Sequence, residues 1–329
     1  MTIIYVIAGA VAVIVGGLLF TRSIEYLASR FGLTTSLVGA VISPILTSLP
    51  ELTVIVVALI HGGLSGSEIS IGTVIGEPFM ASTIIYPMLI IVALFSYFRG
   101  RRERPYLSPG KEVVIPFIVF TVLFPFVLIP HYIRSLFMRY IIGTFLISSY
   151  VTYVIVMSRR GMLLEHEEHS SVVFNRFLKN VSLAAFLQLA LSVILIYFGS
   201  ELLVNGVIFL SKMFRIDPQL LSIVIVPSVS ALPESVVGLH WAYEGKDTLA
   251  IESIVGEKVL YSTFYPGMTL MITDWVLKVS AIFCVLVTVL VSLAMIYYVY
   301  KGRIGYEIAG IGLAGYVIYV LLMVHVLSI

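Results

Sequence analysis

Four glutamates lie within long apolar stretches of this sequence, and they are the residues best placed to do chemistry. Glu51 and Glu234 each close a Leu-Pro-Glu motif, whereas Glu77 and Glu257 each follow a glycine. A charged side chain in hydrocarbon costs about 2.5–3.5 kcal/mol on insertion scales, so each glutamate should have a partner or a function. Carboxylates gathered together repel one another unless a cation lies between them. Calcium takes roughly six to eight oxygen ligands, so the four glutamates predict a calcium site.

Neutral oxygens accompany two of these glutamates. The hydroxyls of Thr47 and Ser48 precede Glu51, and the hydroxyl of Ser230 precedes Glu234. Four prolines lie shortly before the same glutamates: Pro44, Pro50, Pro227 and Pro233. Proline interrupts the helical hydrogen-bond ladder, and unwound backbone at membrane depth is tolerated where it lines a cavity. The hydroxyls and freed carbonyls therefore predict ligands for a second cation such as sodium.

The composition is that of a membrane protein. Of 329 residues, 60% are hydrophobic and 12% are charged, against about 25% charged in a soluble domain. The net charge of +2 does not suggest a nucleic-acid partner. The sequence holds no Ser/His/Asp or His-Glu-x-x-His pattern, so we expect a protein that is not an enzyme and has no cofactor besides the ions it transports.

Ten apolar stretches are long enough to cross a bilayer as helices. They are residues 3–29, 34–60, 70–98, 112–130, 135–158, 181–212, 218–243, 248–270, 274–300 and 305–328. Loops after the odd-numbered stretches carry thirteen lysines and arginines, and loops after the even-numbered ones carry four. Basic residues favour the cytoplasmic side. We therefore expect a multi-pass protein of the plasma membrane with both termini outside.

The two halves of the chain repeat one another. Residues 31–51 align with residues 214–234 without a gap, and residues 71–77 resemble residues 251–257. With five stretches in each copy, the second must enter the membrane from the opposite side. We predict an all-α membrane protein with ten transmembrane helices in two inverted five-helix repeats, at residues 1–160 and 181–329, joined by a cytoplasmic linker at 161–180.

Inverted repeats are typical of secondary transporters that work by alternating access. The two-fold relation should bring the four glutamates together near the midplane. A single buried glutamate beside a proline is as readily a structural kink, but four at equivalent positions favour a site. Gly72 and Gly76, with Gly256 opposite, should let the third and eighth stretches approach closely.

The paired Leu-Pro-Glu motifs, each followed by a glycine-containing helix, resemble the two repeats of the calcium/cation antiporter superfamily, which includes the sodium/calcium exchangers. The resemblance, of a prokaryotic type, spans nearly the whole chain. Its most specific segment is Thr-Ser-Leu-Pro-Glu at residues 47–51, and Ser-Ala-Leu-Pro-Glu at 230–234 is a near match. The resemblance implies that Glu51 and Glu234 bind calcium and that Thr47, Ser48 and Ser230 line sodium or calcium sites. It also implies that a monomer suffices.

The third and eighth stretches depart from that family's pattern. Glu77 and Glu257 stand where the family has serine, and Ala81 and Tyr261 replace a later Asn or Asp. Lys258 replaces an asparagine, and two interpretations of it stay open. The lysine either pairs with a carboxylate such as Glu257, or it occupies a cation position itself.

These features lead to one main hypothesis and two alternatives. The main hypothesis is a secondary antiporter that exchanges Ca²⁺ for Na⁺ or H⁺, in which the first and sixth stretches slide to switch access. An antiporter with changed cation selectivity is a variant of it. A divalent-cation channel or uniporter is the alternative from another class, but a channel normally needs a continuous pore or a symmetric oligomer.

Overall fold

The computed structural model describes the backbone of residues 2–30, 48–159, 172–176 and 180–327, and nearly all of it is helical. A helix satisfies its own backbone hydrogen bonds, which a bilayer requires of any spanning segment. The α-helices are α1 (Thr2–Arg30), α3 (Leu49–His61), α4 (Gly63–Met80), α5 (Tyr86–Phe98), α6 (Val114–Leu123), α7 (Ile129–Ile133), α8 (Leu136–Arg159), α9 (Val181–Phe214), α10 (Pro218–Glu244), α11 (Asp247–Ser262), α12 (Phe264–Ile272), α13 (Val279–Tyr300) and α14 (Tyr306–Leu327). The same residues also form three short 3₁₀ helices, η3 (Lys111–Val113), η4 (Phe124–Leu128) and η5 (Val173–Arg176), and one π-helix, η2 (Ala81–Ile85).

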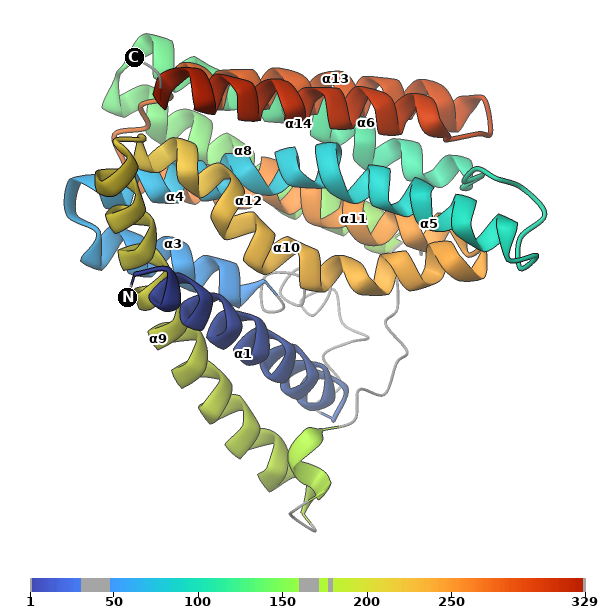
Figure 1. The fold of residues 1–329 in the computed structure, drawn as a ribbon, viewed down its shortest axis with the longest axis horizontal. Coiled ribbons are helices and arrows are strands. Elements are labelled where there is room, and N and C mark those ends of the chain that lie inside the picture. The colour runs from blue at the N-terminus through green and yellow to red at the C-terminus, as the bar shows by residue number, and fades with distance from the viewer. Residues whose placement is uncertain (1, 31–47, 160–171, 177–179, 328–329) are drawn as a thin grey trace. The chain divides into compact units, whose positions relative to one another are not determined.

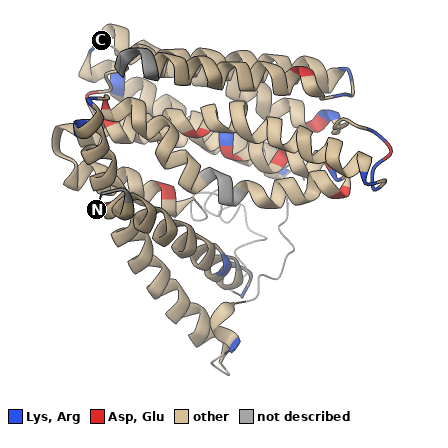
Figure 2. Cartoon of the chain, in the orientation of Figure 1, with Lys and Arg blue, Asp and Glu red and all other residues tan. Residues whose placement is uncertain are grey.

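In the described part of the chain, seven helical segments are long and apolar enough to cross a membrane. They are Ile4–Ile24, Gly63–Phe98, Lys111–Ile133, Leu136–Arg159, Val181–Phe214, Val279–Tyr300 and Tyr306–Met323. Helix α10 adds a bent candidate, whose parts Pro218–Ser230 and Ser235–Glu244 meet at 59°. Figure 2 shows basic residues gathered mainly at helix ends and loops. The prediction of an all-α membrane protein is confirmed, whereas the ten spans and the inverted repeat stay predictions.

The chain divides into two compact units, and the first comprises Met1–Ser70 and Val151–Leu210. Within it α1 lies against α9 through small residues. A Cβ on Gly9 would be 2.8 Å from the Gly199 carbonyl oxygen, and one on Gly16 would be 2.8 Å from Ile196. The Gln188 side chain also donates to the Leu19 carbonyl at 2.9 Å. Glycines allow two backbones to approach this closely, so α1 and α9 form a tightly joined pair (Figure 1).

The second unit comprises Ile71–Tyr150 and Ser211–Ile329. In it α13 packs on α6 and α14, while α10 packs on α5 and α11 (Figure 1). Its interior is apolar, with fully buried aromatic rings from Tyr86, Phe117, Phe120 and Phe124. Each unit draws on both predicted sequence halves, and the division at residues 161–180 stays a prediction.

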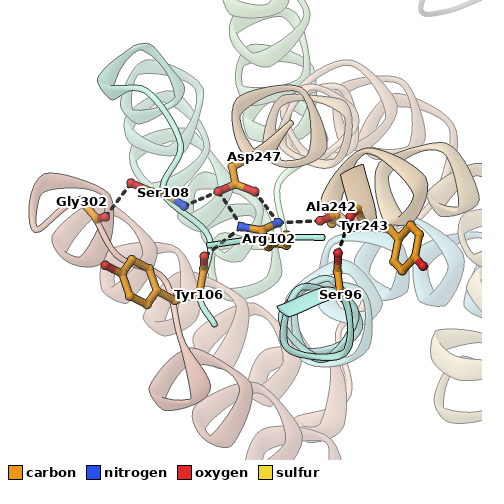
Figure 3. Close-up of polar contacts among 8 residues, drawn as sticks. All are labelled: Ser96, Arg102, Tyr106, Ser108, Ala242, Tyr243, Asp247 and Gly302. Carbon is orange, nitrogen blue, oxygen red and sulfur yellow. Dashed lines mark hydrogen bonds and ion pairs between the residues drawn. The ribbon is translucent and has the colours of Figure 1, made fainter. Parts of the chain in front are cut away.

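A buried ion pair fixes the loop after α5 to the turn between α10 and α11 in the second unit (Figure 3). The guanidinium of Arg102 lies 2.7 Å from Asp247 Oδ1 and donates to Oδ2 at 2.8 Å. It also donates to the carbonyl oxygens of Ala242, at 2.5 Å, and Tyr106, at 2.9 Å. The Ser108 amide donates to Asp247 as well, at 2.7 Å. Both charged side chains are 10% exposed or less, and these bonds offset the cost of burying them.

The prolines act differently from one another. Pro50 lies in the first turn of α3, where its missing N–H would have no helical partner. Pro227 and Pro233 lie within α10, which stays helical but bends between Ser230 and Ser235. Pro44 lies outside the described residues. The prolines were expected to interrupt the helical hydrogen bonds. In the described residues, α10 bends near its two prolines, and Pro50 lies at the start of α3.

Candidate cation-binding site

Glu77 is a buried carboxylate held by a residue of the other predicted repeat. It lies in α4, is 5% exposed, and accepts a hydrogen bond from the hydroxyl of Ser230 in α10. That hydroxyl also lies 3.1 Å from the Val226 carbonyl oxygen. A hydrogen bond to a carboxylate is charge-assisted and therefore stronger than one between neutral groups. The structure thus brings together two residues that the sequence predicted as cation ligands.

Two glycines of α4 explain why Glu77 comes so close to α10. A Cβ on Gly72 would lie 2.0 Å from Ser222 Oγ, and one on Gly76 would lie 2.4 Å from the Ile223 carbonyl oxygen. Any larger residue would push the two helices apart. The glycines were expected to face the eighth stretch, which contains α11. They instead face α10, the seventh, and so place Glu77 beside Ser230.

The helix changes its geometry directly after Glu77. Pro78 follows it within α4, and η2 begins three residues later as a single π-helical segment. The hydroxyls of Ser82 and Thr83 donate to the carbonyls of Pro78 and Phe79, each at 2.8 Å. Proline removes a backbone donor, and π-helical turns are frequent at functional sites.

Glu51 and Ser48 lie in the first unit and are also buried. Glu51 is 2% exposed and Ser48 is 4% exposed, although both adjoin the start of α3. A helix N-terminus favours a carboxylate in its first turn, so this position stabilises a negative charge. Thr47 lies outside the described residues.

The structure describes the two glutamates of the second predicted repeat less fully. Glu257 lies in α11 and is partly exposed. Glu234 lies in α10 at the bend, and its side chain is outside the described residues. Among the side chains that are described, no group of three or more His, Cys, Asp or Glu is arranged to hold a metal. Convergence of the four glutamates on one ion therefore stays a prediction.

Lys258 is buried, at 1% exposure, among hydroxyls and aromatic rings. Its ammonium donates to Ser82 Oγ at 2.8 Å and to Ser292 Oγ at 2.9 Å. It also lies 4.3 Å from the centre of the Phe120 ring and 5.1 Å from that of Tyr86. Over the described residues, no carboxylate lies within ion-pair distance of it.

Sequence reasoning missed several of these polar groups. Ser82 and Ser292 gave no signal, because isolated serines in apolar helices usually bond to their own backbone. Glu201 had a signal, since it is an acidic residue well inside the apolar helix α9, where it is half-buried.

Comparisons with known proteins agree with this architecture. Residues 1–159 and 184–325 match the family described as sodium/calcium exchanger protein. No match is found among curated protein sequences.

Solved structures with the same fold include the H⁺/Ca²⁺ exchanger CAX, with 18% sequence identity, a TM-score of 0.73, and coverage of 99% of this chain and 87% of that one. They also include native YfkE, at 15% identity and TM-score 0.70, covering 98% of this chain and 91% of that one. The sodium-calcium exchanger NCX_Mj matches at 20% identity and TM-score 0.58, covering 98% and 99%. Since the family match extends over most of the residues, the chain belongs to the sodium/calcium exchanger family of the calcium/cation antiporter superfamily, and is a membrane cation antiporter of that family.

Proposed function

We propose that this protein exchanges Ca²⁺ for Na⁺ or H⁺ across the plasma membrane by alternating access. Its cation ligands are four glutamates and three hydroxyl residues: Glu51, Glu77, Glu234, Glu257, Thr47, Ser48 and Ser230. The fold is ten transmembrane helices in two inverted five-helix repeats with both termini outside. It acts as a monomer in the lipid bilayer, without a resident cofactor.

The bond between Ser230 and Glu77 is the observation that carries this proposal. It joins the Leu-Pro-Glu segment of one predicted repeat to the Gly-Glu segment of the other, across α10 and α4. A buried carboxylate that already has a hydroxyl beside it offers two hard oxygen ligands, the kind that Ca²⁺ prefers. Competition between Ca²⁺ and the counter-ion for such oxygens is sufficient to couple the two fluxes.

The pairing of α1 with α9 supports the proposed change of access. These helices contain the first and sixth predicted spans, and they pack on each other through glycines within one compact unit. Helices joined this tightly can move as one body, which is how transporters with inverted repeats switch sides.

The counter-ion is the open part of the proposal. The printed description of one structural relative names H⁺/Ca²⁺ exchange, and that of another names sodium-calcium exchange. The carboxylates at Glu77 and Glu257 could carry protons, whereas the hydroxyls of Ser48 and Ser230 suit Na⁺.

Calcium uptake into proteoliposomes tests the proposal. We expect an outward Na⁺ gradient or an outward H⁺ gradient to drive uptake of radioactive Ca²⁺, and Glu51→Gln or Glu77→Gln to abolish it. Glu244→Gln is the matched control, because Glu244 is a surface carboxylate paired with Lys246. Uptake that needs neither gradient would favour the channel. Gradient-driven flux of another cation, with none of Ca²⁺, would favour changed selectivity.

A further inference from the structure

We propose that Lys258 is a tethered cation, whose ammonium fills a binding position in the second unit that otherwise takes a small monovalent cation. The inference deepens the proposed function and depends on it only for the consequence for ion coupling. It rests on the acceptors around the ammonium, on the rings beside it, and on the helices that it joins.

The two hydroxyls around Lys258 are oriented as acceptors. Ser82 Oγ donates its own proton to the Pro78 carbonyl at 2.8 Å, and Ser292 Oγ donates to the Thr288 carbonyl at 2.8 Å. Each hydroxyl has one proton, so the lone pairs of both oxygens are left for Lys258 Nζ. Two oxygens that present only lone pairs form a site for a cation.

Aromatic rings complete the site on another side of the ammonium. The Phe120 ring centre lies 4.3 Å from Nζ, with Tyr86 at 5.1 Å and Phe117 at 5.9 Å. The face of an aromatic ring attracts a cation and repels a lone pair. These ring faces therefore favour an ammonium over a neutral amine at this position, and with the two hydroxyls they offset part of the cost of burying the charge.

The lysine does not act by neutralising its neighbour in sequence. Consecutive residues of a helix do not face each other. Glu257 is partly exposed, whereas Lys258 is directed into the buried cage of serines and rings. Its positive charge is stabilised by hydroxyl oxygens and ring faces, as the charge of a bound Na⁺ or K⁺ would be.

The position of the ammonium connects it to the candidate site. Ser82 belongs to η2, the π-helix that begins four residues after Glu77, and Ser292 belongs to α13. A cation at this point therefore joins η2, α11 and α13. A permanent cation here keeps η2 in place without an ion from solution, so fewer external cations are needed per transport cycle.

Replacing the lysine by alanine should convert the tethered cation into an exchangeable one. The test uses purified full-length Lys258→Ala in detergent, and thermal unfolding in chlorides of Na⁺, K⁺ and n-propylammonium. N-methylglucamine chloride at equal ionic strength is the reference, because that cation is too large to enter. We expect at least one small cation to stabilise the variant. At cation concentrations well above the dissociation constant, each tenfold increase in concentration should raise the unfolding free energy by about 1.4 kcal/mol.

Three further proteins separate this outcome from a general salt effect. Without calcium and at fixed pH, the thermal stability of wild-type protein should not depend on which monovalent cation is present. If Na⁺ stabilises wild type by binding at the proposed transport site, Glu51→Gln should remove that response. Lys301→Ala, which removes an exposed lysine that also lies over a ring, should resemble wild type. Lys258→Ala combined with Ser292→Ala should lose the response.

A folded Lys258→Ala variant that responds to no small cation more than to N-methylglucamine would overturn the inference. If the variant folds only when purified with one of those cations, that rescue is the predicted result, and failure with all of them overturns it. The assay measures no flux. If wild-type protein shows no calcium exchange in proteoliposomes, the proposed function is refuted, but the cation response of Lys258→Ala is unaffected.

Discussion

Replacing Gly76 by alanine should force α4 away from α10 beside the carboxylate of Glu77. The new Cβ would lie 2.4 Å from the Ile223 carbonyl oxygen, 2.8 Å from Ile223 Cα and 2.8 Å from Pro227 Cγ. Favourable contacts between such atoms are about 3.5–4.0 Å. Two of these atoms are backbone and the third belongs to a proline ring, so no rotamer change relieves the overlap. The helices must therefore separate by roughly 1 Å.

The size of the effect follows from two opposing terms. Overpacking a well-filled interior costs about 1–3 kcal/mol. Exchanging glycine for alanine inside a helix gains about 1 kcal/mol from propensity. Gly310→Ala in α14 is the matched control, because among the described atoms nothing lies within 4 Å of its new Cβ. The difference between the two variants cancels propensity and should equal the overpacking cost, about 1–3 kcal/mol.

The same displacement should weaken calcium binding. Ser230 lies one helical turn beyond Pro227, so moving α10 lengthens the hydrogen bond from Ser230 to Glu77. Both residues are proposed calcium ligands, and losing about 1.4 kcal/mol of their interaction with the ion lowers its affinity tenfold, so we expect a loss of calcium affinity of about tenfold.

Denaturant unfolding in detergent and calcium uptake by proteoliposomes measure the two effects on the same preparations. If Gly76→Ala proves as stable as Gly310→Ala and keeps the calcium affinity of wild type, the close approach of α4 and α10 does not position Glu77, and the reasoning fails.

Four further variants, in two matched pairs, test other contacts. Arg102→Ala leaves Asp247 buried without its cation and should cost about 3–5 kcal/mol of unfolding free energy, measured by denaturant titration. Glu307→Gln, at an exposed pair, should change the same quantity by less than about 1 kcal/mol, and equal losses would contradict the argument. Ser230→Ala should lower the calcium affinity, measured as calcium-dependent stabilisation, by about tenfold, because it removes a hydroxyl oxygen proposed as a calcium ligand. Ser228→Ala should leave it unchanged, since that hydroxyl donates to a backbone carbonyl at 2.6 Å; a matching loss there would refute the assignment.

Helix positions could be predicted from sequence because apolar length decides them. The stretch expected at 181–212 is α9, Val181–Phe214, and the one expected at 135–158 is α8, Leu136–Arg159. Internal breaks could not be predicted as well. The stretch at 248–270 is divided at Thr263 into α11 and α12, and the one at 70–98 contains η2. Such breaks depend on tertiary partners, which hydropathy does not contain.

The types of residue in the candidate site could be predicted from the sequence, but which residues contact one another could not. An acidic residue in an apolar helix indicates that a partner or a function is required, and Glu77 was identified in that way. The predicted repeat relates Glu77 to Glu257 as equivalent positions, but such equivalence does not predict that each carboxylate accepts from a hydroxyl. That Ser230 donates to Glu77 depends on the approach of α4 to α10, which Gly72 and Gly76 permit.

Lys258 shows that the partner of a charged residue in a membrane helix depends on the direction of its side chain, and not only on its neighbours in the sequence. Its position after Glu257 suggests an ion pair, yet its ammonium meets Ser82 and Ser292 from other helices. A lysine that donated to Glu257 would lower the charge available to a divalent ion. A lysine held by neutral oxygens instead adds a positive charge to the helix bundle and leaves Glu257 available for its proposed role as a calcium ligand. The predicted four-glutamate site therefore keeps its preference for a divalent cation, with the lysine serving a separate, monovalent position.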